Sequence, residues 1–329
     1  MFDVVTIGDA VSDIFIRPSE LSVTCPMGRI RGKTCFEPVI CLPYGDKIPI
    51  SEIHYDIGGS AANVAVGLSR LGFNTGFIGA VGKDQNGQKI ISRLEKEGVK
   101  TKWVKQGKDV QTNFSLIISY KGERTILVYR GLEDYSQLEL PKVLNTKWLY
   151  VGPLGEGFEK LYSAIISKVA EKNIKLSLNP GTLQIESKAE LKRILRVAEI
   201  VFVNKEEAEE IVGLSRPALV KDLLKALKQY GAKVVVITDG AEGAYSFDGE
   251  EFLHISAYQA KRKEVTGAGD AFSTGCLGAL VLGKDVREGL RWGVINSASV
   301  IEKNGAESGL LNISQIERRL NRAPNPRAL

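Results

Sequence analysis

Short apolar runs alternate with longer amphipathic stretches along most of the chain. The runs hold four to seven mainly apolar residues bounded by polar residues or glycine, at 4–8, 75–81, 148–151, 175–178, 200–203 and 234–237. Runs this short are typical of strands buried on both faces of a sheet. The amphipathic stretches have helical spacing, at 60–71, 86–97, 157–172, 187–198, 206–212 and 218–229. This alternation predicts an α/β protein with a mainly parallel central sheet and helices on both of its sides.

Two segments break the alternation. Residues 14–56 contain five prolines and show no helical pattern. Residues 110–130 form two β-type runs separated by Lys121, Gly122 and Glu123, which predicts a hairpin with its turn at Gly122. We interpret the two segments as a small antiparallel sheet that stands out from a single domain spanning residues 1–329. Such a sheet is either a lid over a site or a decoration without a gating role.

Composition excludes several classes of protein. Hydrophobic residues make up 43% and charged residues 25%, which is the balance of a soluble globular protein. The net charge of +5, without a run of five like charges, argues against a nucleic-acid partner. No apolar stretch approaches the ~20 residues of a membrane span, and no basic region precedes the first apolar run. We therefore expect a cytoplasmic protein without a membrane partner.

Cysteine and histidine give no metal-site pattern. The four cysteines contain no C-x-x-C pair and there are only two histidines, which argues against zinc. A disulfide within the cluster of Cys25, Cys35 and Cys41 stays open.

Small polar residues and glycines follow the predicted strands. Asp9 and Asp13 follow the first run, and Asn179, Asn204 and Thr238 follow three later ones. The carboxyl ends of parallel strands share one edge of the sheet, and ligands bind beyond that edge. The sequence therefore predicts a site for a polar ligand there.

Two glycine-rich segments open predicted helices, at 58–63 and 267–270. The unpaired first-turn N–H groups of a helix and its dipole attract anions such as phosphate. Asp270 lies in one of these first turns, where its carboxylate could act as a general base on a hydroxyl. Acidic residues also favour helix N-termini for stability alone, so its role stays open on this pattern. Neither a G-x-G-x-x-G motif nor a correctly spaced P-loop is present.

The order of these motifs resembles the PfkB family of ribokinase-like sugar and nucleoside kinases over nearly the whole chain. Residues 58–65 (GGSAANVA) with Leu71-Gly72 are similar to the family's first signature, and residues 265–272 (VTGAGDAF) to its second. Residues 122–125 (GERT), Asn204-x-x-Glu207 and Thr238-x-Gly240-x-x-Gly243 follow the family order. The resemblance implies a ribokinase-like three-layer α/β/α domain with a small β-sheet lid made of parts of 14–56 and 110–130.

The resemblance also implies roles for individual residues. Asp270 would be the catalytic base, and the amides of Gly267, Ala268 and Gly269 would form the anion hole for the transferred phosphoryl group. Mg²⁺ would be held by Asn204 and Glu207, through water. The acceptor would be bound by Asp13, Gly58, Gly59 and Asn63. The nucleotide, ATP, would contact Asn179, Asn204, Thr238, Gly240, Gly243 and Asn296.

The family pattern is broken at two positions. Glu264 stands where relatives often have Asp, which leaves binding of K⁺ open, and Val11 stands where many sugar kinases have Asn. We expect transfer of the γ-phosphoryl group of ATP to a small hydroxylated acceptor: a sugar, a sugar derivative or a nucleoside. An adenosine-type nucleoside kinase and a catalytically silent ligand-binding protein on the same fold are the alternatives. A homodimer through the lid is a further expectation.

Overall fold

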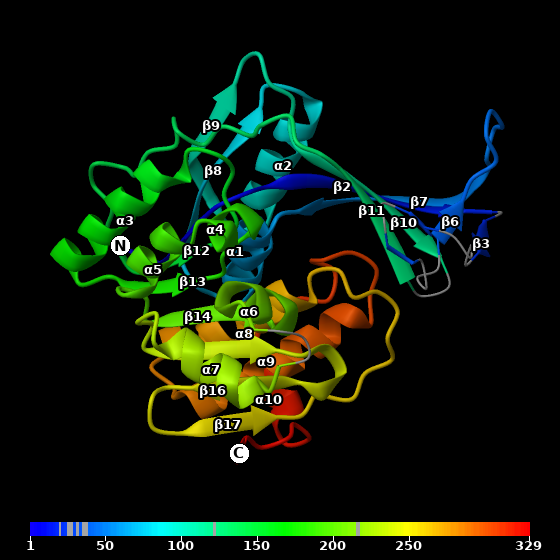
Figure 1. The fold of residues 1–329 in the computed structure, drawn as a ribbon. Coiled ribbons are helices and arrows are strands. Elements are labelled where there is room, and N and C mark those ends of the chain that lie inside the picture. The colour runs from blue at the N-terminus through cyan, green and yellow to red at the C-terminus, as the bar shows by residue number, and fades with distance from the viewer. Residues whose placement is uncertain (20, 25–28, 31–32, 35–38, 121–122, 215–217) are drawn as a thin grey trace.

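A ten-stranded sheet forms the centre of the molecule (Figure 1). The computed structural model describes residues 1–19, 21–24, 29–30, 33–34, 39–120, 123–214 and 218–329. The strand order is β18-β17-β16-β15-β14-β13-β12-β1-β8-β9, and the strands from β15 to β9 are parallel. The strands are β1 (Phe2–Ile7), β8 (Thr75–Gly82), β9 (Lys100–Gly107), β12 (Thr146–Val151), β13 (Lys175–Leu178), β14 (Ile200–Asn204), β15 (Val234–Thr238), β16 (Ala244–Phe247), β17 (Phe252–Ile255) and β18 (Arg327–Ala328).

Helices cover both faces of this sheet. They are α1 (Ser60–Arg70), α2 (Gln85–Lys96), α3 (Phe158–Lys172), α4 (Thr182–Glu186), α5 (Lys188–Leu195), α6 (Lys205–Val212), α7 (Val220–Lys228), α8 (Ala268–Val281), α9 (Val286–Ile301) and α10 (Ile313–Leu320). Alternate residues of β1 enter two separate cores: Val4 packs with the α1, α8 and α9 layer, and Val5 with the α3, α5 and α7 layer. The predicted three-layer α/β/α arrangement is confirmed.

The helix α8 carries the GAGD segment at its N-terminus and lies buried between α1 and α9. Its residues from Ala271 to Ala279 are all buried. A Cβ on Gly275 would meet the carbonyl oxygen of Trp292 at 2.5 Å, so the glycine permits the close approach of α9. This packing fixes the position of the first turn of α8.

A second sheet of four strands stands out from the body (Figure 1). Its order is β11-β10-β2-β7, with β2 (Val11–Pro18), β7 (Ile50–Gly58), β10 (Phe114–Tyr120) and β11 (Glu123–Tyr129). The predicted hairpin is present as β10 and β11, and its turn lies outside the described residues. The fully antiparallel arrangement that we predicted is wrong, because β2 and β10 pair in parallel. No hairpin links these two strands; both leave the body in the same direction.

Several boundaries differ from the sequence prediction. The helix α9 begins at Val286, because the side chain of Asp285 accepts a hydrogen bond from the amide of Glu288 and caps it. The stretch 187–198 is helical only from Lys188 to Leu195. The segment 18–49 contributes β3 (Ser22–Thr24), β4 (Arg29–Ile30), β5 (Lys33–Thr34) and β6 (Val39–Cys41).

The described residues bear on the expected lack of a membrane span and on the disulfide that the sequence left open. No helix in the described ranges is long and apolar enough to cross a membrane. The two described cysteines, Cys41 and Cys276, are not joined by a disulfide, and Cys25 and Cys35 lie outside the described residues.

Candidate active site

The carboxylate of Asp270 lies in the first turn of α8. The helix is preceded by Gly267 at a φ of 77°, a conformation that favours glycine. A Cβ on Gly267 would also meet the Cβ of Ala306 at 2.6 Å. Asp270 Oδ2 accepts a hydrogen bond of 2.8 Å from Asn63 Nδ2 on α1. Burial raises the pKa of Asp270, and hydrogen bonds from Asn63 and Ser60 oppose that rise.

Two further carboxylates face the same region from the first strands. Burial, reinforced by the charge of Asp270, raises the pKa of Asp9 to about 7. Burial and the charges of Asp56, Asp9 and Asp270 raise the pKa of Asp13 to about 7, against a hydrogen bond from Ser115. Like charges in a poorly solvated site disfavour ionisation of all three groups. The carboxylates therefore form one coupled cluster.

The backbone at Gly58 makes room for Asp13. Strands β2 and β7 place Asp13 opposite Asp56, next to the end of β7. A Cβ on Gly58 would lie 2.2 Å from Asp13 Oδ2. The next residue, Gly59, has a φ of 93° and would bring a Cβ to 2.6 Å from the carbonyl oxygen of Asp9. Both glycines therefore act by keeping side-chain atoms away from the carboxylate cluster.

Two cavities meet at Asp270. The acceptor-side cavity, of about 480 Å³, is lined by Asp13, Gly59 and Asn63 among others. The helix-side cavity, of about 220 Å³, is lined by all three residues of the predicted anion hole (Gly267, Ala268 and Gly269) and by Asn204 and Thr238. The residues common to both are Ser60, Asn179, Glu207, Gly267 and Asp270. Asp270 therefore lies where a ligand in one cavity would touch a ligand in the other.

Asn204 and Glu207 form a capping box at the start of α6. The amide of Glu207 donates to Asn204 Oδ1 at 2.8 Å, and the amide of Asn204 donates to Glu207 Oε2 at 2.9 Å. Burial raises the pKa of Glu207, and the charge of Asp270 adds to the rise. The second carboxylate oxygen, Oε1, makes no hydrogen bond within the described part of the chain. Among those residues no group of three or more His, Cys, Asp or Glu side chains is arranged to hold a metal.

Three predicted nucleotide contacts lie outside these cavities. The side chain of Asn296 is fully buried, donating to the carbonyl of Ala271 at 2.7 Å and accepting from the amide of Leu311 at 3.0 Å. Its polar atoms are thus used in joining α9 to neighbouring backbone, which argues against the predicted contact. Gly240 and Gly243 form the turn after β15, beside Thr238, and line neither cavity.

Asn179, by contrast, lies at the junction. Its Nδ2 donates to the carbonyl of Phe202 at 3.0 Å, and its Oδ1 accepts from the hydroxyl of Tyr150 at 3.3 Å. The two bonds fix the amide plane at the edge shared by both cavities.

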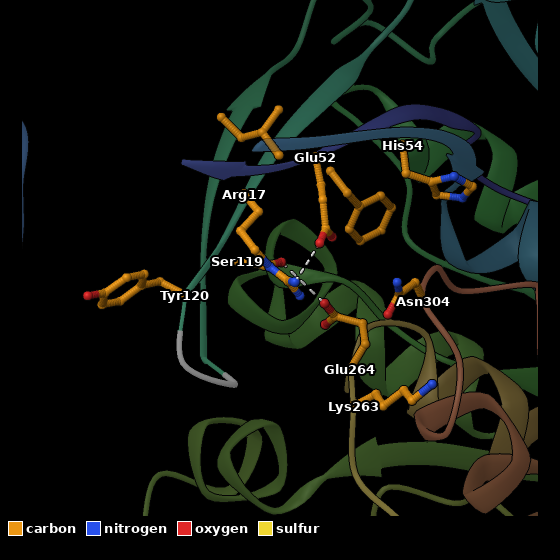
Figure 2. A pocket seen from close by; sticks show the side chains of 10 residues that line it. Arg17, Glu52, His54, Ser119, Tyr120, Lys263, Glu264 and Asn304 are labelled. Carbon is orange, nitrogen blue, oxygen red and sulfur yellow. Dashed lines mark hydrogen bonds and ion pairs between the residues drawn. The ribbon is translucent and has the colours of Figure 1, made fainter. Parts of the chain in front are cut away.

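The carboxylate of Glu264 connects the small sheet with the loop before Gly267. Glu264 Oε1 accepts from Thr266 Oγ1 at 2.8 Å and from the amide of Val265 at 3.0 Å. It also forms an ion pair with Arg124 of β11 at 3.3 Å, and Ser119 of β10 donates to Oε2 at 3.4 Å. Figure 2 shows the cavity, of about 250 Å³, in which Glu264 faces the small sheet.

Some lining residues were missed by the sequence analysis. Asp9 was noted only as a strand-end residue, although its position directly after β1 was the available signal. Arg130 and Tyr135 line the acceptor-side cavity and carry no motif that could have identified them.

A family model described as pfkB family carbohydrate kinase matches residues 33–312. The chain belongs to the pfkB family of carbohydrate kinases. This confirms the predicted family and makes the protein a kinase.

Relatives of this pfkB family kinase include sugar kinases from archaea and bacteria. It is 29% identical over 251 residues to an uncharacterized sugar kinase of Archaeoglobus fulgidus, covering 74% of this chain and 98% of that protein. It is 29% identical over 284 residues to the 5-dehydro-2-deoxygluconokinase of Bacillus subtilis, covering 79% and 85%. The nucleoside kinase of Methanocaldococcus jannaschii, an archaeal member of the ribokinase family, has a TM-score of 0.79 at 22% identity, covering 98% and 99%. The ribokinase-like fold is thereby confirmed.

Proposed function

We propose that this pfkB family kinase transfers the γ-phosphoryl group of ATP to a hydroxyl of a sugar, sugar derivative or nucleoside. The observation that carries the proposal is the position of Asp270 where the two cavities meet. An acceptor in the larger cavity and a triphosphate over the first turn of α8 would bring the hydroxyl and the γ-phosphorus together there. Holding two reactants in this way is the main contribution of an enzyme to phosphoryl transfer.

Asp270 acts as the general base in this proposal. Its raised pKa makes the ionised carboxylate a better proton acceptor than an exposed one. The hydrogen bond from Asn63 on α1 to Oδ2 holds the carboxylate of Asp270 in one orientation. In this proposal that carboxylate takes the proton of the acceptor hydroxyl. The group that bonds to phosphorus is the acceptor oxygen, and ADP leaves on the opposite side.

The N-terminus of α8 supplies the stabilising charge. Gly267, Ala268 and Gly269 line the helix-side cavity at the start of α8. The amide of Ala268 donates to the carbonyl of Val265 at 3.2 Å, so in this proposal the amides of Gly267 and Gly269 are the main donors to the phosphoryl group. With the helix dipole they favour the negative charge that develops on the transferred phosphoryl oxygens. A Cβ on Gly269 would meet no atom within 4 Å, so the backbone there is open to a ligand.

The residues present fit a Mg²⁺ ion held mainly by water and phosphate. Glu207 offers one unengaged carboxylate oxygen at the junction, and the oxygen of Asn204 is used in the capping box. Mg²⁺ commonly keeps several waters and binds through one or two carboxylates plus substrate phosphates. When bound, the ion would neutralise charge on the phosphates.

The sequence left undecided whether K⁺ binds at Glu264, and the surroundings of this carboxylate do not fit such a site. Its Oε1 already receives protein donors and the guanidinium of Arg124, a cation in the place where a metal would lie. We propose that no monovalent cation is bound by this carboxylate.

The acceptor is proposed to be rich in hydroxyl groups. Asp9 Oδ1 and Asn63 Oδ1 are buried and receive no hydrogen bond from the described residues. Both are acceptors, so a ligand that donates several O–H groups would satisfy them. A nucleoside meets the same requirement through its ribose, and the nucleoside kinase reading remains the second candidate.

The small sheet is proposed to be the lid and also a dimer interface. Ile53 and Tyr55 of β7, and Leu127 and Tyr129 of β11, are between 40% and 61% exposed. Strand register puts these four on the face opposite Asp13. An exposed apolar sheet face is suited to packing against a second copy about a two-fold axis.

The cytoplasmic location and the absence of nucleic-acid and membrane partners stay predictions.

The decisive experiment measures ADP release with a panel of sugars, sugar acids, sugar phosphates and nucleosides in the presence of Mg²⁺. We expect ADP formation to depend on one class of acceptor. ATP binding without ADP release on any acceptor would favour the catalytically silent ligand-binding protein instead.

A further inference from the structure

The hydroxyl of Tyr150 reaches the junction of the two cavities from inside the core. Tyr150 lies on β12 and is fully buried among the side chains that pack against α1 and α8. Its hydroxyl donates to Asn179 Oδ1 at 3.3 Å, and Asn179 lines both cavities. A phenylalanine would fill the same apolar space, so packing alone does not explain why this side chain carries a hydroxyl.

The charges around this hydroxyl show that it lies close to the reacting groups. Burial raises the pKa of Tyr150 well above its usual range, and three carboxylates add to the rise, those of Asp270, Asp9 and Glu207. A hydrogen bond with Ser273, which is one turn along α8 from Asp270, opposes the rise. Because the hydroxyl stays protonated, it remains a hydrogen-bond donor throughout the neutral pH range.

The amide of Asn179 is held by two bonds and keeps one donor free. Its Oδ1 accepts from Tyr150, and one N–H of Nδ2 donates to the carbonyl of Phe202 at 3.0 Å. A side-chain amide has a second N–H, and this one has no acceptor among the residues that the structure describes. Since the two bonds fix the plane of the amide, the direction of the free N–H is fixed as well.

We propose that Tyr150 is a positioning residue for phosphoryl transfer: its hydroxyl orients the amide of Asn179 so that the free N–H donates to an oxygen of the phosphoryl group in transit. This inference rests on the proposed kinase function. Donors that are oriented in advance stabilise the charge of a transition state most effectively. Without the hydroxyl, the amide keeps only its bond to Phe202 and can pivot about it. Its Oδ1 then turns toward water in the cavity, because a buried acceptor without a donor is unfavourable.

The test compares two substitutions of tyrosine by phenylalanine. Tyr150→Phe removes the hydroxyl that bonds to Asn179. Tyr162→Phe on α3 is the matched control, because its hydroxyl is equally buried and has no hydrogen-bond partner in the described part of the chain. Assays use the full chain with ATP, Mg²⁺ and ribose, gluconate, fructose 6-phosphate or adenosine. The acceptor that gives the fastest ADP release by the wild type is kept for all variants.

A positioning role should affect kcat and not KM. We expect Tyr150→Phe to lower kcat about 10-fold, while KM for ATP and KM for the acceptor each change by less than about threefold. An interaction made only in the transition state has this effect. Tyr162→Phe should leave kcat within about twofold of the wild type. Circular dichroism and thermal melting report whether both variants are folded.

A double-mutant cycle shows whether Tyr150 acts through Asn179. Asn179→Ala alone should lower kcat about 100-fold. In that background Tyr150→Phe should lower kcat by less than about twofold, because the hydroxyl no longer has an amide to orient. Asn179→Asp keeps an oxygen for the Tyr150 hydroxyl but has no N–H, so its kcat should fall at least as far as that of Asn179→Ala.

Four results would overturn the inference and leave the kinase assignment intact. They are an unchanged kcat in Tyr150→Phe, a rise in KM without a fall in kcat, an equal loss of kcat in both backgrounds of the cycle, and a retained kcat in Asn179→Asp. The last result needs no change at Tyr150 and therefore decides even if Tyr150→Phe does not fold. Absence of ADP from the wild type with all four acceptors would instead refute the proposed function, and this inference with it.

Discussion

Asn63 and Asp270, which are 207 residues apart in the chain, are joined by a hydrogen bond of 2.8 Å from Nδ2 to Oδ2. One residue comes from the glycine-rich start of α1 and the other from the glycine-rich start of α8. The bond therefore connects the side of the cavity that would hold the acceptor to the side that would hold phosphate. Asn63 Oδ1 remains without a donor in the described structure and is available to an acceptor hydroxyl.

Asp270→Asn should remove the general base, while the amide keeps the size of the side chain and an oxygen that can accept the hydrogen bond from Asn63. We expect kcat to fall by about 10²- to 10⁴-fold while the Kd for ATP changes by less than about threefold. Steady-state ADP release and equilibrium nucleotide binding measure the two quantities. Near-normal turnover in this variant would exclude Asp270 as the base.

The ionised carboxylate of Asp9 should lower the free energy of unfolding of the protein. Because burial raises its pKa from 3.8 to about 7, the destabilisation grows as the pH rises from about 4, where the carboxyl of the unfolded chain ionises, to about 7, and it stays constant above that. Asp9→Asn should therefore raise the free energy of unfolding by about 1–3 kcal/mol at pH 8 and by much less at pH 5. Urea titrations at the two pH values test this. An equal effect at both would show that Asp9 stays in one protonation state.

Gly58→Ala tests the room left for Asp13. The new methyl group would overlap Asp13 Oδ2, 2.2 Å away in the present arrangement, so the carboxylate must move. We expect KM for the acceptor to rise about tenfold or more with KM for ATP unchanged. The far-ultraviolet circular dichroism spectrum reports whether folding is intact. Unchanged KM for the acceptor, in a folded variant, would remove Asp13 from acceptor binding.

Replacing Arg124 should make the turnover of the enzyme depend on the monovalent cation in the buffer. In the present structure this guanidinium faces Glu264, so turnover of the wild type should be the same, within twofold, in Na⁺ and K⁺ buffers of equal ionic strength. Arg124→Met leaves Glu264 without its cationic partner, and we expect activation by K⁺ to appear in that variant. Strong K⁺ activation of the wild type would contradict this assignment of Glu264.

The dimer proposal predicts a mass change on altering the exposed face of the small sheet. Leu127 is 52% exposed, and Leu127→Glu would place a charge at the centre of the expected contact. Light scattering coupled to size exclusion should give a dimer for the wild type and a monomer for the variant. Lys142→Glu, outside the small sheet, serves as the control. A monomeric wild type at micromolar concentration would refute the dimer.

Sequence reasoning succeeded where one local pattern determines structure. The buried strands of the central sheet read as short apolar runs, and the capping residues of α6 and α8 read as motifs. It failed where pairing depends on distant segments. Whether β2 pairs with β10 in parallel is decided by two strands separated by almost a hundred residues, and no local pattern encodes their direction.

The candidate site shows the same division. Asp270 and its glycines were identified from a short motif, since helix N-terminal chemistry is local. The predicted nucleotide contact of Asn296 stays a prediction, and no sequence pattern shows that its amide is occupied by backbone partners. Arg130 and Tyr135 lie in a loop, and only the fold brings them into the same cavity as Asp270.

The tight packing of α8 against α9 has a consequence for how this protein can change over time. Gly275 touches the backbone of Trp292 so closely that few substitutions are tolerated, and the reacting end of the molecule is held by this contact. Ile53 and Leu127, on one face of the small sheet, are exposed, so their side chains can change without disturbing that packing. New acceptors can therefore be acquired by mutation of loops and sheet surface while the phosphoryl-transfer machinery is inherited unchanged.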